Sequence, residues 1–234
     1  MNDLVTYELD GPIATISMDD GKVNVFSIPM LQALHEAFDR AESDGAVVVV
    51  TGREGYFSAG FDLKTIAGGT GPLLEMLTLG ATLAERLLGF PRPVVCACTG
   101  HAYPAGAFLL LASDVRIGAD GPYRIGLNEV QIGLTVPWFA IELARYRLHP
   151  AYFDRTVVNA TMYGPREAVP AGFLDQVVPS DALRAAGLEA ASAAAALDPV
   201  AHAATKRRAR AQALAALRSA IESELTPPTD PPGK

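Results

Sequence analysis

The sequence predicts an α/β fold, in which a mainly parallel sheet with covering helices is followed by a helical region of the same domain. Short apolar runs rich in β-branched residues alternate with helical patterns up to about residue 136, as in a series of β-α-β units. The runs at residues 46–50 and 94–98 contain no polar residue, which is typical of strands buried on both faces. From residue 137 onward, alanine-rich helical patterns dominate.

The first elements are a hairpin and a helix. Residues 5–9 and 13–18 are β-branched, alternating runs on either side of the turn-forming Asp10-Gly11-Pro12. A helix is expected at residues 28–42, with Ser27 as its N-cap and with Leu31, Leu34 and Phe38 at helical spacing.

The later elements continue the alternation and then become helical. We expect strands at residues 46–50, 94–98, 115–118 and 174–177. We expect helices at residues 73–88, 105–112, 139–148, 151–159, 165–169, 182–197 and 200–225. The chain therefore divides into an α/β core (residues 1–136), a helical region (137–225) and a proline-rich tail (226–234) that is expected to be disordered.

The composition excludes several classes of function. The chain has 234 residues, 50% of them hydrophobic, and a net charge of −7, which would repel a nucleic acid. No stretch approaches the roughly 20 apolar residues of a membrane span, so the apolar excess must enter a core, a pocket or a subunit interface. The opening MNDLVTYELDG shows no signal-peptide pattern, and a cytoplasmic location is expected.

Two glycine-containing turns follow neighbouring buried strands. The first is YFSAGFDLK (residues 56–64), in which Asp62 could cap a short helix, and the second is TGHAYPAGAF (residues 99–108), which opens a helix. Each turn could direct one backbone N–H group at a carbonyl oxygen, and together they would form an oxyanion hole. Taken alone, either turn could equally be an ordinary connection between a strand and a helix.

Glu129 is the one carboxylate between residues 125 and 140. A lone acid in apolar surroundings should have a raised pKa and could accept and return a proton, although a structural or surface glutamate fits the pattern as well. The run Lys206-Arg207-Arg208-Ala209-Arg210 fits either a solvated helix face or a phosphate site. Cys96 and Cys98 are expected to be buried thiols, and no metal site is expected because no second pair of ligands follows them.

Three motifs in order, YFSAGFDLK, PRPVVCACTGHAYPAGAFLLLASDVRI and IGLNEVQIGLTVP, resemble the crotonase superfamily of enoyl-CoA hydratases and isomerases. The opening IATISMDDGKVNVFS is similar to the first strand pair of that family. The resemblance covers roughly residues 4–200. It implies a spiral of ββα units followed by helices that assemble a homotrimer or a dimer of trimers.

The resemblance also implies a site. The N–H groups of Phe61 and Ala105 would hold the thioester oxygen of an acyl-CoA, and Glu129 would move the proton. Phe108 stands where hydratases of the family carry a first glutamate. Coenzyme A would lie across two loops, represented by Lys22, Val23 and Val25 and by Ser58, Gly60, Asp62 and Leu63. Phe61, Phe108 and Trp138 would line a fatty acyl pocket, to which residues 73–88 could contribute.

Three functions are compatible with this pattern. A single glutamate favours isomerisation of an enoyl-CoA double bond over hydration. A hydratase using Glu129 with another partner, or a non-catalytic acyl-CoA-binding protein, are the alternatives. The substrate is carried as a coenzyme A thioester, so no permanently bound cofactor, nucleic acid or membrane partner is expected. Lys206 and Arg207 are candidates to complete the coenzyme A site of a neighbouring subunit.

Overall fold

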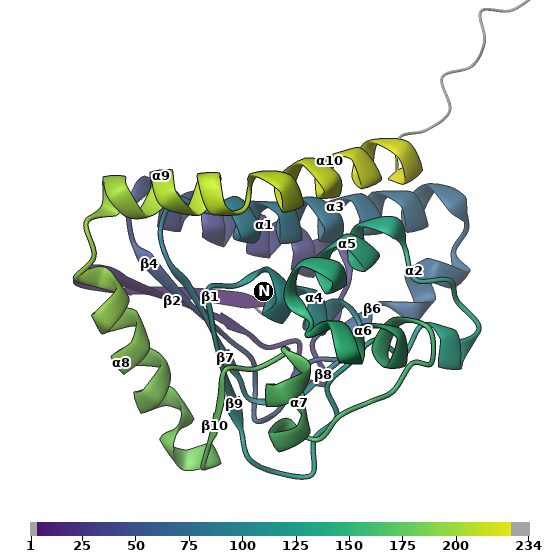
Figure 1. Ribbon diagram of the computed structural model, residues 1–234, viewed down its shortest axis with the longest axis horizontal. Coiled ribbons are helices and arrows are strands. Elements are labelled where there is room, and N and C mark those ends of the chain that lie inside the picture. The colour runs from purple at the N-terminus through teal and green to yellow at the C-terminus, as the bar shows by residue number, and fades with distance from the viewer. Residues whose placement is uncertain (1–3, 226–234) are drawn as a thin grey trace, which may run out of the picture.

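The computed structural model describes residues 4–225, so the predicted disordered tail at residues 226–234 lies outside the described residues. A six-stranded sheet runs through the core in the order β1-β2-β4-β7-β9-β10 (Figure 1). The predicted hairpin is confirmed, because β1 pairs with β2 in antiparallel fashion, and the other pairings in this sheet are parallel. The strands are β1 (Val5–Asp10), β2 (Ile13–Met18), β4 (Val47–Thr51), β7 (Val94–Cys98), β9 (Val115–Ala119) and β10 (Gln176–Val178).

Four shorter strands form two small parallel ladders beyond this sheet. β3 (Val25–Phe26) pairs with β6 (Gly60–Phe61), and β5 (Gly55–Ser58) pairs with β8 (Gly100–Ala102). The sequence did not predict these ladders, because strands of two to four residues are too short to show a periodic pattern. Long strand, short strand and helix follow one another repeatedly, which confirms the predicted spiral of ββα units.

The sheet is buried on both faces, as the apolar runs predicted. Val48, Val50, Val94 and Cys96 point into the larger core cluster, whereas their neighbours Val47, Val49 and Val95 pack against α8 (Leu183–Ala195) on the opposite face. Figure 1 shows α8 separate from the layer of helices that covers the other face. That layer includes α1 (Ile28–Ser43), α3 (Thr70–Gly89) and α10 (Ala211–Leu225). Ser27 caps α1 by accepting from the N–H of Met30, as predicted.

The remaining helices agree with the predicted pattern except near the C-terminus. They are α2 (Leu63–Ala67), α4 (Ala105–Ala112), α5 (Trp138–Arg147), α6 (Pro150–Val157), α7 (Pro165–Ala171) and α9 (Pro199–Ala209). The single helix expected at residues 200–225 is wrong, because α9 and α10 are separated at Arg210. The strand expected at residues 174–177 lies slightly later, at β10. Among residues 4–225, no helix is long and apolar enough to span a bilayer.

A buried ion cluster lies at the break between α9 and α10. The Asp114 carboxylate accepts from Nζ of Lys206 at 2.6 Å and from Nη2 of Arg210 at 2.7 Å. It also accepts from the backbone N–H of Val94 at 2.7 Å. Both cations therefore lie near the start of the inner strands β7 and β9, and α10 begins directly after Arg210. From there α10 packs against α3 and α5, and its last residues, Glu224 and Leu225, line the cavity described below.

Candidate active site

The structure brings together the two glycine-containing turns that the sequence singled out. β5 and β8 pair side by side, and the N–H of Tyr103 donates to the carbonyl of Ser58 at 3.1 Å. Gly60 has a φ of +91°, and a Cβ at this position would lie 2.3 Å from Cδ of Pro104. A glycine is therefore required at residue 60, both by the backbone conformation and by the close approach of the second turn.

Phe61 and Ala105 follow these contacts directly. Phe61 ends the short strand β6, and Ala105 is the first residue of α4. The N-cap of α4 is Pro104, which has no side-chain hydrogen bond to the first turn, and the first N–H groups of a helix have no partner within it. The arrangement thus places a strand-end peptide and a helix N-terminus in adjoining turns, from which two N–H groups could act on one carbonyl oxygen.

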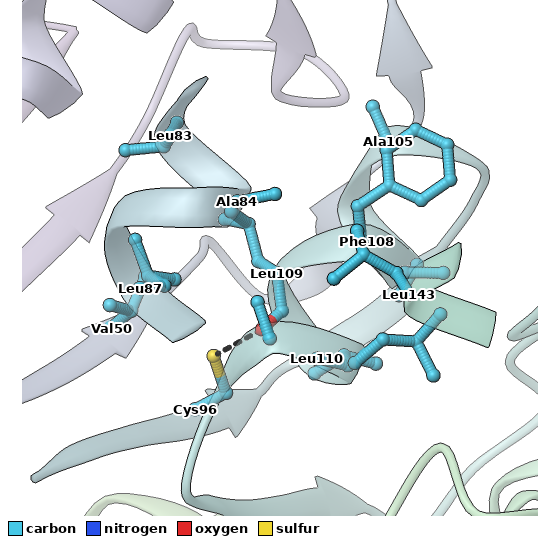
Figure 2. Close-up of a cluster of buried hydrophobic side chains, with 14 of the residues drawn as sticks. Val50, Leu83, Ala84, Leu87, Cys96, Ala105, Phe108, Leu109, Leu110 and Leu143 are labelled. Atoms are coloured by element: carbon cyan, nitrogen blue, oxygen red, sulfur yellow. Dashed lines mark hydrogen bonds between the residues drawn. The ribbon is translucent and has the colours of Figure 1, made fainter. Parts of the chain in front are cut away.

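A cavity of about 420 Å³ opens beside these turns. Its walls are mostly aliphatic and aromatic, and they come from both turns, α2, α3, α4 and the segment before α5. The apolar lining residues include Phe61, Leu63, Ile66, Leu73, Leu74, Leu77, Phe108, Ile132 and Leu134. The expectations that Phe61 and Phe108 line a pocket and that residues 73–88 contribute to it agree with this lining. Figure 2 shows why α4 is fixed there: it packs between side chains of α3 (Leu83, Ala84, Leu87) and Leu143 of α5.

Glu129 extends into this cavity from a rigid segment. Its backbone carbonyl accepts from the N–H groups of Ile132 at 3.0 Å and Leu134 at 2.9 Å, and Gln131 donates to the carbonyl of Ala160 at 2.8 Å. The Glu129 residue is only 4% exposed, and neither carboxylate oxygen has a hydrogen-bond partner among residues 4–225. Burial raises the pKa of Glu129 to about 7. The predicted buried acid with a raised pKa is confirmed.

Two asparagines of this region were missed by the sequence analysis. Asn128 lines the same cavity, and its buried Oδ1 has no partner among the described residues. Only its position next to Glu129 could have pointed to it. Asn24 is fully buried at a φ of 54°, and its amide donates to the carbonyls of Met18, Tyr56 and Phe57. An asparagine in the left-handed region tolerates this conformation, and here it joins the two loops expected to hold coenzyme A.

The two loops expected to bind coenzyme A lie side by side. Val25 pairs with Gly60, and the N–H of Ala59 donates to the carbonyl of Val23 at 2.9 Å. The Ser58 hydroxyl is buried and donates to the Asn24 carbonyl at 2.7 Å, so it is engaged within the protein. Lys22 and Leu63 are exposed at the surface of these loops. Asp62 caps α2 as predicted, since its carboxylate accepts from the N–H of Lys64 at 3.2 Å.

Two expected site residues lie elsewhere. Trp138 is 57% exposed at the start of α5 and does not line the cavity, so its predicted place in an acyl pocket is wrong. The reason is that Pro137 and Leu134 face the cavity while the indole points away from it. Lys206 is buried in the ion cluster with Asp114, where it is not available to a neighbouring subunit, and burial lowers its pKa to about 8. Arg207, by contrast, is exposed.

The cysteines belong to the core. Cys96 and Cys98 are buried free thiols in β7, as expected, and burial raises the pKa of each to about 12. The Cys96 thiol lies 3.7 Å from the Leu109 carbonyl that it faces in Figure 2. Within residues 4–225, no group of three or more His, Cys, Asp or Glu side chains is placed to hold a metal ion.

Comparisons with known proteins agree with this geometry. Residues 8–231 match the family described as enoyl-CoA hydratase/isomerase. The fold is similar to that of an enoyl-CoA isomerase from Mycobacterium tuberculosis, with 44% identity, a TM-score of 0.91 and coverage of 95% of this chain and 98% of that one. An enoyl-CoA hydratase from Mycobacterium ulcerans gives 44% identity, a TM-score of 0.91 and coverage of 94% and 97%. Human mitochondrial enoyl-CoA delta isomerase 1 is 29% identical over 198 residues, a match that spans 80% of this chain and only 64% of the human protein.

Proposed function

Because the chain belongs to the enoyl-CoA hydratase/isomerase family, we propose that it shifts the double bond of a fatty 3-enoyl-CoA to the 2-position, with Glu129 as the proton carrier. One observation carries the choice of isomerisation. Within residues 4–225, the Glu129 carboxylate lines the cavity without a hydrogen-bond partner, and the α4 position where a second catalytic glutamate would stand holds the buried Phe108. The other carboxylate of the cavity, Glu224, is exposed and accepts from the N–H of Trp138 at 2.7 Å.

The reaction uses one base and two backbone donors. Glu129 removes a proton from C2 of the substrate, and the electron pair moves onto the thioester oxygen, where the N–H groups of Phe61 and Ala105 stabilise the negative charge. The same carboxyl then returns the proton at C4, so the double bond moves from C3–C4 to C2–C3. One such donor is typically worth about 3–4 kcal/mol, and a positioned base about 10²–10⁴-fold in rate.

The environment of Glu129 suits this role. A pKa of about 7 lets the group accept a proton and release it again near neutral pH. The absence of a protein partner for either oxygen among the described residues leaves both free to face the substrate carbons. The apolar walls, including Phe108, disfavour an ordered water at the same place.

The substrate would be held as a coenzyme A thioester, with no permanently bound cofactor. We propose that the coenzyme A part lies across the joined loops, on Lys22, Val23 and Val25 and on the backbone of Ser58, Gly60, Asp62 and Leu63. An assembly into a homotrimer or a dimer of trimers and a cytoplasmic location complete the proposal. In such an assembly, Arg207, which is exposed on α9, could reach a neighbouring subunit.

The test is turnover of 3-hexenoyl-CoA, followed by the absorbance of the conjugated 2-enoyl thioester. The wild type should form the product, with kcat/KM rising as the pH passes about 7 because Glu129 must lose its proton to act as a base. Glu129→Gln should abolish turnover while acyl-CoA binding, measured by calorimetry, persists. Unchanged turnover in this variant would remove Glu129 from the mechanism. Tight binding without product from any enoyl-CoA would instead identify a non-catalytic acyl-CoA-binding protein.

Hydration of a 2-enoyl-CoA is the second candidate, and Asn128 is the observation that favours it. Its unpartnered Oδ1 and the carboxylate of Glu129 line one cavity, so the two could hold a water between them. Loss of the conjugated-thioester absorbance on addition of 2-hexenoyl-CoA would report this reaction. An Asn128→Leu variant that keeps isomerisation but loses hydration would assign the water to Asn128.

A further inference from the structure

The ring of Phe61 forms part of the cavity wall and packs against helix α3 at a glycine, a residue that has no side chain. Phe61 lines the cavity and is 9% exposed. On its far side lies Gly80 of α3, which is buried and is not part of the cavity lining. A Cβ at Gly80 would lie 2.6 Å from both Cε1 and Cζ of Phe61. The ring therefore rests directly on the helix backbone.

A glycine at this place is costly for the helix. Gly80 lies in the middle of α3, where glycine is about 1 kcal/mol less favourable than alanine. Its helical backbone does not demand a glycine, since α3 is regular on both sides of it. The contact with Phe61 is what a side chain at residue 80 would disturb.

The Phe61 ring also has little freedom to move toward Phe108, the third neighbour besides Gly80 and the cavity. Phe108 lies next to it, with 6.2 Å between the ring centroids, and Phe108 in turn packs edge-on against Phe139 at 5.3 Å. Phe108 is 2% exposed and Phe139 is fully buried, so neither can give way without opening the core. The free direction for the Phe61 ring is into the cavity.

We propose that the Phe61 side chain, seated on Gly80, is the residue that sets how long an acyl chain the cavity accepts. This proposal rests on the proposed function, because it takes the cavity to be the acyl site. The walls from Ile66 to Leu77 suit an unbranched fatty chain, and the Phe61 ring bounds the space that such a chain can fill. The backbone N–H of Phe61 would then bind the thioester oxygen, whereas its side chain would limit the length of the acyl chain.

Two substitutions should move the chain-length preference in opposite directions. Phe61→Leu keeps the backbone N–H but removes the ring. The cavity therefore deepens, and the affinity for acyl-CoA with longer chains should rise. Gly80→Ala keeps Phe61 but pushes its ring into the cavity, so the affinity for acyl-CoA with longer chains should fall. The probes are saturated acyl-CoA thioesters from hexanoyl to hexadecanoyl, whose dissociation constants are measured by calorimetry without any turnover. A change of about tenfold in the ratio of long-chain to short-chain affinity is expected for each variant, since single methylene contacts are worth about that much.

The matched control is Gly71→Ala, the same exchange in the same helix at a position where a Cβ meets nothing within 4 Å. It should leave the ratio unchanged. The double variant Gly80→Ala/Phe61→Leu should return the ratio toward the wild type, because the smaller leucine makes room for the new methyl group, and this rescue excludes general misfolding.

Identical ratios in all proteins, or a shift in the same direction for Phe61→Leu and Gly80→Ala, would overturn the proposal. Its failure is distinguishable from that of the proposed function. Opposite shifts in affinity support it even if the wild type isomerises no 3-enoyl-CoA, and unaltered ratios refute it even if the wild type is an active isomerase. Failure to bind any acyl-CoA would overturn both.

Discussion

Replacing Glu129 with glutamine should make the protein more stable at alkaline pH while removing its proposed chemistry. The carboxylate is 4% exposed and has no hydrogen-bond partner among the described residues, so its charge is carried at a cost. A pKa raised from 4.5 to about 7 corresponds to about 3 kcal/mol in favour of the neutral form. Glutamine has nearly the same shape and no charge, so Glu129→Gln removes this cost.

The sign of the pH dependence follows from proton binding. Between a pH of 4.5 and about 7 the folded state keeps the Glu129 proton and the unfolded state does not. The wild type therefore loses stability as the pH rises through this window, and the loss is complete above the folded-state pKa. Glu129→Gln lacks the titrating group, so its free energy of unfolding relative to the wild type should increase by about 2–3 kcal/mol between about pH 5 and about pH 8.

Urea unfolding of both proteins at the two pH values, at equal protein concentration, measures this change. The comparison between pH values cancels the fixed cost of burying a glutamine amide, which is present at both. The control is Glu75→Gln, because Glu75 is an exposed glutamate of α3 and its replacement should have the same effect at both pH values. If Glu129→Gln gained no more stability at the higher pH than at the lower one, the charge of Glu129 would not be buried at a cost, and the argument for its raised pKa would fail.

Two further predictions concern the framework of the site. Asp114→Ala should lower the free energy of unfolding by about 3–5 kcal/mol in urea, because it leaves the buried cations Lys206 and Arg210 without their carboxylate; a loss no greater than that of the exposed control Asp10→Ala would contradict this. Gly60→Ala should cost about 1–3 kcal/mol from backbone strain alone. Its further clash with Pro104 should abolish turnover, whereas Gly11→Ala, at a positive φ in open space, should bring the strain without the loss of activity.

The sequence revealed those parts of the fold that depend on local patterns. Residues 46–50 and 94–98 could be assigned as buried strands because a strand covered on both faces is apolar throughout, whatever lies against it. The ion cluster at Arg210 could not be foreseen, because its carboxylate comes from Asp114, a residue nearly a hundred positions away in the chain. The helical pattern of residues 200–225 is locally unbroken, so it gives no sign of the division at Arg210.

For the candidate site, too, only the residues that stand out in the local sequence could be predicted. Glu129 stood out because it is a lone acid among apolar residues, a contrast that the sequence shows directly. Trp138 was expected to line the acyl pocket, but the direction of a side chain at a helix start depends on the preceding loop, and the indole is exposed. Asn128 drew no attention because an asparagine next to a glutamate is ordinary. It becomes notable because its buried oxygen lines the cavity and has no partner in the part of the chain that the structure describes.

The division between backbone and side-chain chemistry explains how this site can depart from the pattern of its family. The proposed donors are peptide N–H groups, so they do not depend on which side chains residues 61 and 105 carry. Glu129 is then the one position where the identity of the side chain is needed for the proton transfer. A carboxylate at position 108 would lie among Phe61 and Phe139 and share a low-dielectric cavity with Glu129, and each charge would raise the pKa of the other group. The aromatic ring at 108 avoids that repulsion, so that the proposed proton transfer between two carbons depends on the Glu129 carboxyl alone.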